Sequence, residues 1–275
     1  MASIKLYKGS FGHVSLLSAA SNLVTHAHPE AHIIIWVDGD PGEMMVSGHR
    51  VRPGPEHAIG INSLEPHSHS FAAGCAPGRF LAFYIDPQWV AGRSGQASDA
   101  RLFHRPDFPL DPWLRDFAIH LFQRIETDPG EEALAHYEIE RLIDRLFEVA
   151  RAAEPARHHA RHGGVGDFRV RKAIEKMRAN VSGRMNFDEL ARSVGLSRPH
   201  FFALFKEHTQ LTPNVFWNTL RMEEALKQLE SSEESLTSVA CQLGFTTQGN
   251  FTRFFRDHAG VPPTLYREAA RPDVF

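Results

Sequence analysis

Two stretches in the last third of the chain, residues 186–208 and 235–258, repeat one pattern in the same register. Each stretch has a short helical pattern, then a glycine (Gly195 or Gly244), then a second helix pattern with apolar residues at i, i+3 and i+4 spacing. Glycine at this point permits the positive φ that a tight turn between two helices needs. The repeat therefore predicts two helix-turn-helix units and an all-α fold for this part of the chain.

The turn of each predicted unit is followed by a hydroxyl residue, Ser197 or Thr247, which suits the start of the next helix. In a helix-turn-helix, the second helix lies in the major groove of DNA and offers its N-terminal residues to the base edges. The alternative is a plain helical bundle with chance repetition, and two units in register argue against it.

The outward positions of the two second helices are the candidate DNA contacts. Arginine suits guanine O6 and N7, Gln and Asn suit adenine N6 and N7, and apolar side chains suit the thymine methyl group, although any one of them could contact phosphate only. Lys206 and Arg256 are assigned to phosphates. The predicted DNA-binding residues are Arg198, Pro199, His200, Phe202, Ala203, Lys206, Thr247, Gln248, Asn250, Arg253 and Arg256. Phe202 could instead pack on the neighbouring helix.

Residues 168–270 resemble the DNA-binding domain of the AraC/XylS family of bacterial transcription regulators. The resemblance is carried by Leu190-Ala191, Gly195-Leu196-Ser197, Leu204-Phe205-Lys206, Leu220 to Ala225, Gly244-Phe245, Phe251, Phe255-Arg256, Gly260 to Pro263 and Tyr266-Arg267. It implies seven helices, with a central helix over about 214–230 joining the two units. Gln210, Pro262 and Gly249 depart from the residues usual in the family, which implies altered caps and altered base preference.

The net charge is distributed unevenly. The whole chain carries −3, with 15 Lys and Arg against 20 Asp and Glu in residues 1–166 and 15 against 13 in residues 167–275. The first part also holds 14 of the 17 histidines. A weakly basic DNA reader attracts DNA poorly through charge alone. Its affinity must depend on a few placed cations and on dimerisation.

Residues 4–86 contain short apolar stretches cut by turn residues, such as Ile33 to Val37 and Phe80 to Ile85, which favours an antiparallel barrel or sandwich. Two helices are predicted after Pro112. The second has an apolar stripe that packs on its own chain or forms a homodimer seam. The residues assigned to dimerisation are Ile139, Leu142, Ile143 and Leu146.

Histidines recur at alternate positions in two places of the N-terminal region. Alternate residues of a strand share a face, so several imidazoles can meet in one barrel mouth. The spacing resembles the metal motif of the cupin fold. The predicted metal ligands are His26, His28, His32 and His67, with Glu30 and His69 as possible further metal or effector ligands. Such a site suits zinc, nickel, copper or iron. The alternative is a cavity whose histidines bind no metal.

These features predict an α+β chain with two domains: a cupin-like antiparallel β-barrel with helices at 1–151, for effector sensing and dimerisation, a linker at 152–166, and a DNA-binding domain at 167–275. The predicted function is a sequence-specific transcription regulator that responds to a small molecule or metal. The alternative is a cupin metalloenzyme fused to a DNA-binding domain, but no catalytic motif supports an enzyme.

The expected partners are operator DNA, an effector, a second copy of the chain and, for an activator, RNA polymerase. Two cysteines give no disulfide framework, and the start of the sequence lacks the pattern of a signal peptide. The longest apolar run is too short for a membrane helix. We therefore expect a cytoplasmic bacterial protein without a membrane partner.

Overall fold

The computed structural model describes residues 3–94, 101–127, 132–153 and 167–270. The chain divides into two compact units. The first contains Met1–Ala20, Pro29–Ser63 and His69–Arg161, and the second contains Ser21–His28, Leu64–Ser68 and His162–Phe275. This division differs from the predicted one, because two short N-terminal segments belong with the C-terminal helices. Most of the predicted linker, residues 154–166, lies outside the described residues.

The N-terminal strands are short and are separated by turns, as predicted. Their bounds are β1 Ser3–Gly9, β2 Gly12–Ala19, β3 Leu23–His26, β4 Ala31–Asp38, β5 Glu43–Val46, β6 His49–Val51, β7 His57–Ile61, β8 His67–Ser70, β9 Gly78–Ile85 and β10 Asp107–Pro109. The helices among them are α1 Pro87–Ser94, α2 Pro112–Thr127 and α3 Glu132–Ala152.

The strands form two sheets, with the orders β1-β2-β9-β4-β7-β10 and β3-β8-β5-β6. The neighbours β1 and β2, β2 and β9, β9 and β4, and β4 and β7 are antiparallel. The predicted antiparallel sheet-rich fold is therefore present. The predicted closed barrel is not, because each sheet ends in edge strands among the described residues.

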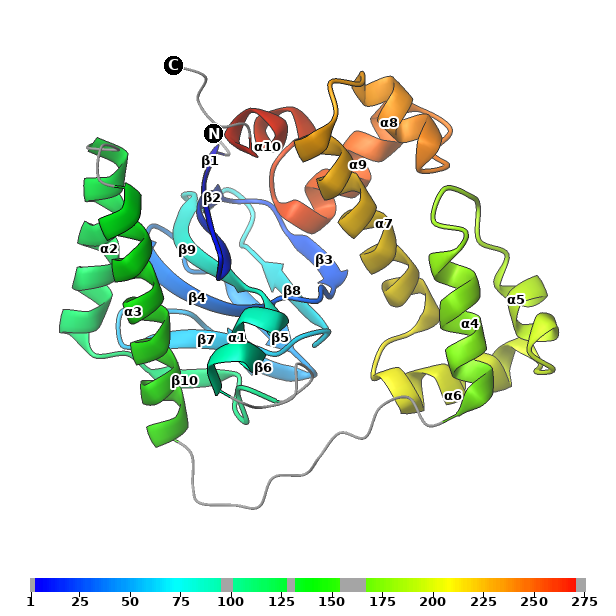
Figure 1. Cartoon of the computed structure of the whole chain (residues 1–275), viewed down its shortest axis with the longest axis horizontal. Coiled ribbons are helices and arrows are strands. Elements are labelled where there is room, and N and C mark those ends of the chain that lie inside the picture. The colour runs from blue at the N-terminus through cyan, green and yellow to red at the C-terminus, as the bar shows by residue number, and fades with distance from the viewer. Residues whose placement is uncertain (1–2, 95–100, 128–131, 154–166, 271–275) are drawn as a thin grey trace. The chain divides into compact units, whose positions relative to one another are not determined.

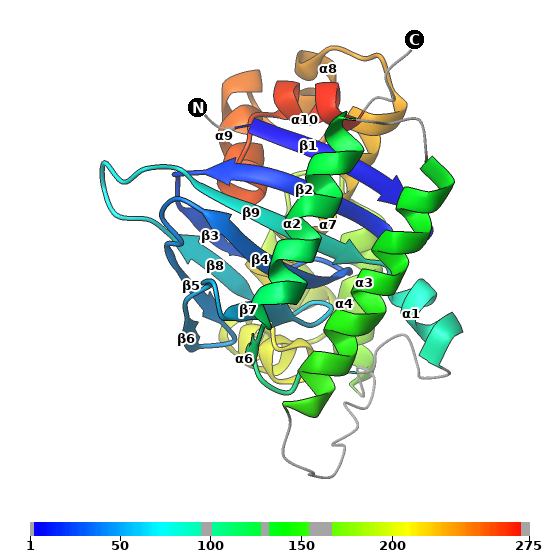
Figure 2. The same cartoon turned by 90° about the vertical axis from the view of Figure 1, so that its left-hand side faces the viewer.

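The six-stranded sheet has buried side chains on both of its faces. On β4, Ile33 and Ile35 pack in the cluster beneath α2 and α3, whereas Ile34 packs with Met44 and Phe80 on the other face. This alternation follows from the two-residue period of a strand. Figure 2 shows α2 and α3 lying across the strands β1, β2, β9 and β4. The six-stranded sheet is thus a middle layer of the first unit.

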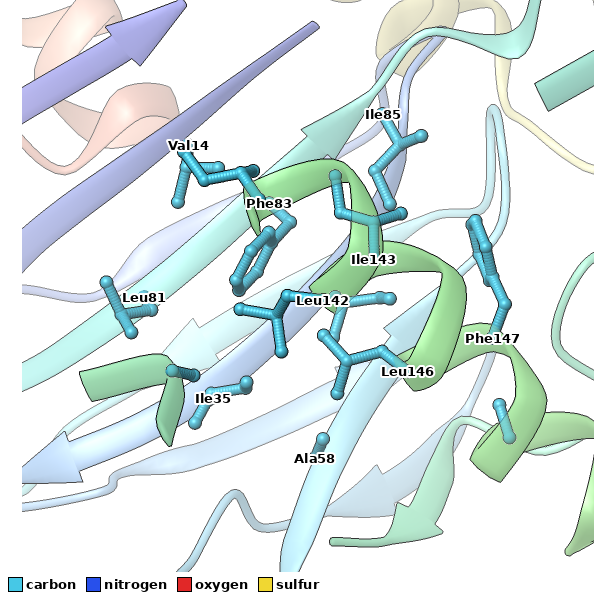
Figure 3. Packing of buried hydrophobic residues seen from close by; sticks show 14 of the residues in the cluster. Val14, Ile35, Ala58, Leu81, Phe83, Ile85, Leu142, Ile143, Leu146 and Phe147 are labelled. Carbon is cyan, nitrogen blue, oxygen red and sulfur yellow. The ribbon is translucent and has the colours of Figure 1, made fainter. Parts of the chain in front are cut away.

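The apolar stripe of α3 faces this sheet. Ile139, Leu142, Ile143 and Leu146 are each at most 1% exposed within a single chain. Figure 3 shows Leu142 and Leu146 beside Phe83 and Ile35 of the sheet. Side chains buried in their own core cannot form a seam with a second copy. The assignment of these four residues to dimerisation is therefore corrected, and packing on their own chain is the alternative that holds.

The second unit contains seven helices in its described part, as the resemblance implied. They are α4 Phe168–Arg178, α5 Phe187–Ser193, α6 Arg198–Thr209, α7 Pro213–Ser231, α8 Leu236–Gln242, α9 Gln248–Ala259 and α10 Pro263–Ala270. Figure 1 shows α7 as the long helix that joins α5 and α6 to α8 and α9. No helix in the described ranges is both long and apolar enough to cross a membrane.

Candidate nucleic-acid interface and histidine cluster

The two repeated stretches fold into the same unit. The helices α5 and α8 have seven residues each, and α6 and α9 have twelve residues each. Between the helices, Gly195 has φ 77° and Gly244 has φ 72°, in the left-handed region that favours glycine. The two helix-turn-helix units that the repeat predicts are therefore present, with the predicted glycines at their turns.

The predicted apolar seam fixes each second helix from behind. Phe201 and Phe205 of α6 are fully buried, with ring centroids 5.5 Å apart. Phe251 and Phe255 of α9 are also fully buried, at 6.0 Å. These spacings lie in the range of favourable aromatic pairs. The seam turns the opposite face of each helix toward solvent.

The caps of the two second helices differ. Thr247 accepts a hydrogen bond from the backbone N–H of Asn250 at 3.1 Å, as an N-cap residue does. Ser197 occupies the same position before α6, but its side chain makes no cap hydrogen bond. At the C-terminal end of α6, Gln210 takes the left-handed conformation with φ 60°. At the matching end of α9, Gly260 takes it with φ 77°.

The predicted DNA-contacting residues lie on the solvent face of α6 and α9 or at their N-termini. All eleven are exposed except Phe202, which is half-buried. Its ring meets Phe187 of α5 edge to face, with centroids 5.7 Å apart. Packing on the neighbouring helix is thus the alternative that the structure supports for Phe202. The other ten side chains form the candidate interface.

Several of these side chains have partners within the unit. Arg198 pairs with Asp188 at 3.0 Å, and Gln248 accepts a hydrogen bond from Thr237 at 2.8 Å. Asn250 donates its side-chain N–H to Thr246 at 2.8 Å. Exposed pairs of this kind are worth little free energy, so DNA contacts can replace them.

The central helix α7 sets the spacing of the two units. Its 19 residues give a length of about 28 Å, close to the ~34 Å of one DNA turn. Arg221 of α7 donates to the carbonyl of Leu243 at 2.8 Å and stacks 3.8 Å from the ring centroid of Phe245. Burial lowers the pKa of this arginine to about 10. Arg221 thereby holds the second helix-turn-helix unit against α7.

The segment Ser21–His28 packs on the same helices. Thr219 of α7 donates to the carbonyl of Ala27 at 2.9 Å, and Ala27 is 2% exposed among the core residues Trp217 and Leu220. Figure 1 places β3 beside α7 and α9. Because the helical core contains Ala27, the segment Ser21–His28 belongs to the second compact unit.

Three of the predicted metal ligands meet here. One ring nitrogen from each of His26, His28 and His67 lies within 4.8 Å of the other two. Ring centroids are 5.2 Å apart for His26 and His28, 4.3 Å for His26 and His67, and 5.0 Å for His28 and His67. Burial lowers the pKa of His26 and of His67, so both imidazoles are neutral near pH 7.

The other predicted ligands lie outside this group. His32 belongs to the first unit, where it donates Nδ1–H to the carbonyl of Glu30 at 3.1 Å and its ring meets Tyr84. His69 bonds the carbonyl of Pro41 at 2.8 Å and packs on Phe80. Strand alternation predicted that His26 pairs with His28 and His67 with His69. His28 lies just beyond the end of β3, and His69 belongs to the first compact unit, so strand alternation does not explain the observed group.

Sequence reasoning missed His258, on the buried face of α9. Its ring centroid lies 6.1 Å from that of His26, and the side chain is 8% exposed. The signal was in the repeat: His258 follows the seam residue Phe255 by three positions, as His208 follows Phe205. Only the fold shows that one of these two histidines lies beside the cluster.

Comparison with known proteins supports this assignment of the C-terminal helices. Residues 190–269 match the family model described as a helix-turn-helix domain. The raffinose operon regulatory protein RafR of Pediococcus pentosaceus is 29% identical over 97 residues, 35% of each chain. The uncharacterised regulator YobQ of Bacillus subtilis is 32% identical over 101 residues, 37% of this chain and 42% of that protein. The matches thus span less than half the length of each of these relatives.

Solved structures extend the likeness to the whole fold. ToxT from Vibrio cholerae with a bound unsaturated fatty acid has a TM-score of 0.53 at 11% identity, covering 97% of this chain and 94% of that one. Another ToxT structure, from Vibrio cholerae O395, has 0.51 at 9%, covering 98% and 97%. Fold and site thus define a double helix-turn-helix domain. Residues 190–269 form such a domain of the AraC type, as the sequence resemblance predicted.

Proposed function

We propose that the chain is a transcription regulator that binds a specific DNA operator through α6 and α9. The observation that carries the proposal is the pair of matching units, each with a buried aromatic seam and an exposed row of DNA-competent side chains. The relatives named as transcriptional regulators support it. Each protein chain reads two successive major-groove segments.

Binding of a small effector to the first unit is the second part of the proposal. The fold likeness to a fatty-acid-bound ToxT supports it. A cavity of about 310 Å³ is lined by the apolar residues Phe103 and Phe108 and by the polar residues His57, Arg105 and Asp107, among others. It suits a small amphipathic molecule, which would shift the population of DNA-competent conformations.

Homodimerisation and, for an activator, contact with RNA polymerase complete the proposal. A weakly basic reader gains affinity by pairing with a second copy on a two-part operator. The surface that pairs the two copies must differ from the four buried side chains of α3. Sedimentation of the full chain, with and without operator DNA, measures this part.

Selection of bound sequences from random DNA tests the central part of the proposal. We expect the full chain to enrich one extended motif. Arg253→Ala should lose the base preference at one position, because a fork to guanine contributes about 1–3 kcal/mol of discrimination. Arg256→Ala should weaken binding of all sequences alike, since a phosphate contact carries no sequence information.

Arg171→Ala, on the exposed side of α4, is the matched control and should leave the motif unchanged. An Arg253→Ala protein that enriches the same motif with the same affinity would contradict the assignment of α9. Absence of any enriched motif with the folded full chain would contradict sequence-specific DNA binding altogether.

A further inference from the structure

The histidine cluster of the second compact unit, His26, His28 and His67, has ring orientations that suit a metal ion. His26 donates Nδ1–H to the carbonyl of Val24 at 2.7 Å, and His67 donates Nδ1–H to the carbonyl of Glu65 at 2.8 Å. A carbonyl oxygen only accepts, so the lone pair of each neutral ring is on Nε2. Metal-binding histidines usually donate their second N–H to a carbonyl or carboxylate in this way.

The spacing of the rings also fits one ion. Two imidazoles at about 2.05 Å on a tetrahedral zinc ion have ring centroids about 5 Å apart. The three observed separations are 5.2, 4.3 and 5.0 Å. The ring nitrogens, now within 4.8 Å of one another, would close to about 3.4 Å around the ion, which small side-chain rotations achieve.

A fourth imidazole, that of His258, lies beside His26. His258 donates Nδ1–H to the carbonyl of Phe254 at 2.6 Å, the same pattern as His26 and His67. Its Nε2 atom is buried and has no hydrogen-bond partner among the described residues. A buried polar atom without a partner is unusual in a folded protein. The ring is 6.1 Å from His26, about 1 Å beyond the spacing expected on a shared ion.

We propose that His26, His28 and His67 bind one divalent transition-metal ion, with His258 as the fourth ligand, and that this ion holds α9 on the segment Ser21–His28. Imidazole ligands suit zinc, nickel, copper and cobalt. The site joins residues from three segments of the second compact unit, Ser21–His28, Leu64–Ser68 and α9. Its consequence for transcription rests on the proposed function, but metal binding itself does not.

The ion would act on the second recognition helix without blocking it. His258 shares the buried face of α9 with Phe251 and Phe255, whereas Gln248, Asn250 and Arg253 are exposed. Metal binding at this face restrains the helix and leaves its DNA side open. The first helix-turn-helix unit provides an internal control, because His208 occupies the matching position of α6 and is only half-buried.

Zinc titration of the metal-free full chain tests the proposal, with binding followed by calorimetry against a competing chelator. We expect one high-affinity ion per chain. Co²⁺ should give the visible absorption of a tetrahedral site. His67→Ala should lower zinc affinity at least about 100-fold, and His258→Ala about 10–100-fold with a changed Co²⁺ spectrum. His208→Ala should match the unchanged protein in both measurements.

Hydrogen exchange gives a second readout of the coupling. Zinc should slow exchange in α9 of the unchanged chain and of His208→Ala, but not in His258→Ala, while α6 should change little. His67→Gln serves beside His67→Ala, and its exchange without metal shows whether it is folded. Zinc affinity that is equal in folded His67→Gln, His258→Ala and the unchanged chain would overturn the proposal.

The two proposals fail in distinguishable ways. A metal-free chain that enriches an operator motif but binds no zinc with high affinity would overturn the metal site and leave the regulator intact. A chain that binds zinc as described but enriches no DNA motif would overturn the regulator and leave the metal site intact.

Discussion

The first helix-turn-helix unit, α5 and α6, and the second, α8 and α9, share helix lengths, turn glycines and aromatic seams but differ in their surroundings. The second recognition helix packs on β3 and carries a buried histidine, His258, beside His26 of the histidine cluster. The matching His208 of the first unit is half-buried. Repetition of a sequence pattern therefore reproduced the fold of the unit, while its contacts with the rest of the chain made the second copy different.

This difference suggests separate tasks for the two units. The first helix-turn-helix unit shares its core with α4, α7 and Ala27 of the segment Ser21–His28, and α6 exposes its candidate DNA contacts. The second has a reading surface on one face and a candidate metal ligand on the other. Matched positions of the two helix-turn-helix units serve as controls for each other.

The two helix-turn-helix units should differ most in how much stability they lose when their turn glycine is replaced by alanine. A Cβ atom on Gly244 would lie 3.0 Å from the carbonyl oxygen of Ser182, whereas a Cβ atom on Gly195 would meet nothing within 4 Å. Both residues have positive φ, which costs a non-glycine residue about 1–2 kcal/mol. We expect Gly244→Ala to destabilise its unit by about 2 kcal/mol or more, and Gly195→Ala by about 1 kcal/mol.

Peptide-resolved hydrogen exchange of the full chain measures these costs as the free energy of opening in α9 and in α6. Equal losses for the two variants would show that the close backbone approach at Gly244 has no energetic weight.

A smaller difference in lost stability is expected when the N-cap residues of α9 and α6 are replaced. Thr247→Ala removes a cap hydrogen bond and should destabilise α9 by about 1 kcal/mol. Ser197→Ala removes no such bond, so its effect on α6 should be near zero. The same exchange experiment reports both, and a loss of about 1 kcal/mol for Ser197→Ala would mean that the hydroxyl does cap α6.

The smallest expected effect is a gain. Gln210 ends α6 in the left-handed conformation that Gly260 takes after α9. Gln210→Gly relieves this strain, partly offset by the larger backbone entropy of glycine in the unfolded chain. We expect a stabilisation of about 0.5 kcal/mol, seen as a higher urea midpoint for loss of α6. Gly260→Gln should shift α9 in the opposite direction, and a shift in the same direction would contradict this account of the caps.

The sequence predicted the helical repeat well because its signals are local. Gly195 and Gly244, the phenylalanine seams and the central helix lie where spacing and turn chemistry put them. The cap of Ser197 was predicted and is absent, since a side-chain rotamer decides it. The short helix α1, Pro87–Ser94, was not predicted, as eight residues give too few turns for a clear period.

Contacts between distant segments could not be predicted. The alternate spacing of His26 and His28 predicted that they lie together, but His258 is more than two hundred residues away, and only the fold brings it beside His26. The stripe of α3 was ambiguous for the same reason. Its spacing shows that one face is apolar but does not say whether the chain's own sheet or a second copy covers that face.

Hydroxyl-radical footprinting on the selected operator tests most directly the claim that both units read DNA. We expect two protected patches on one face of the duplex, about one helical turn apart, for each bound chain. Arg198→Ala should weaken one patch and Arg253→Ala the other. A single patch, or two patches that respond equally to both substitutions, would contradict the claim.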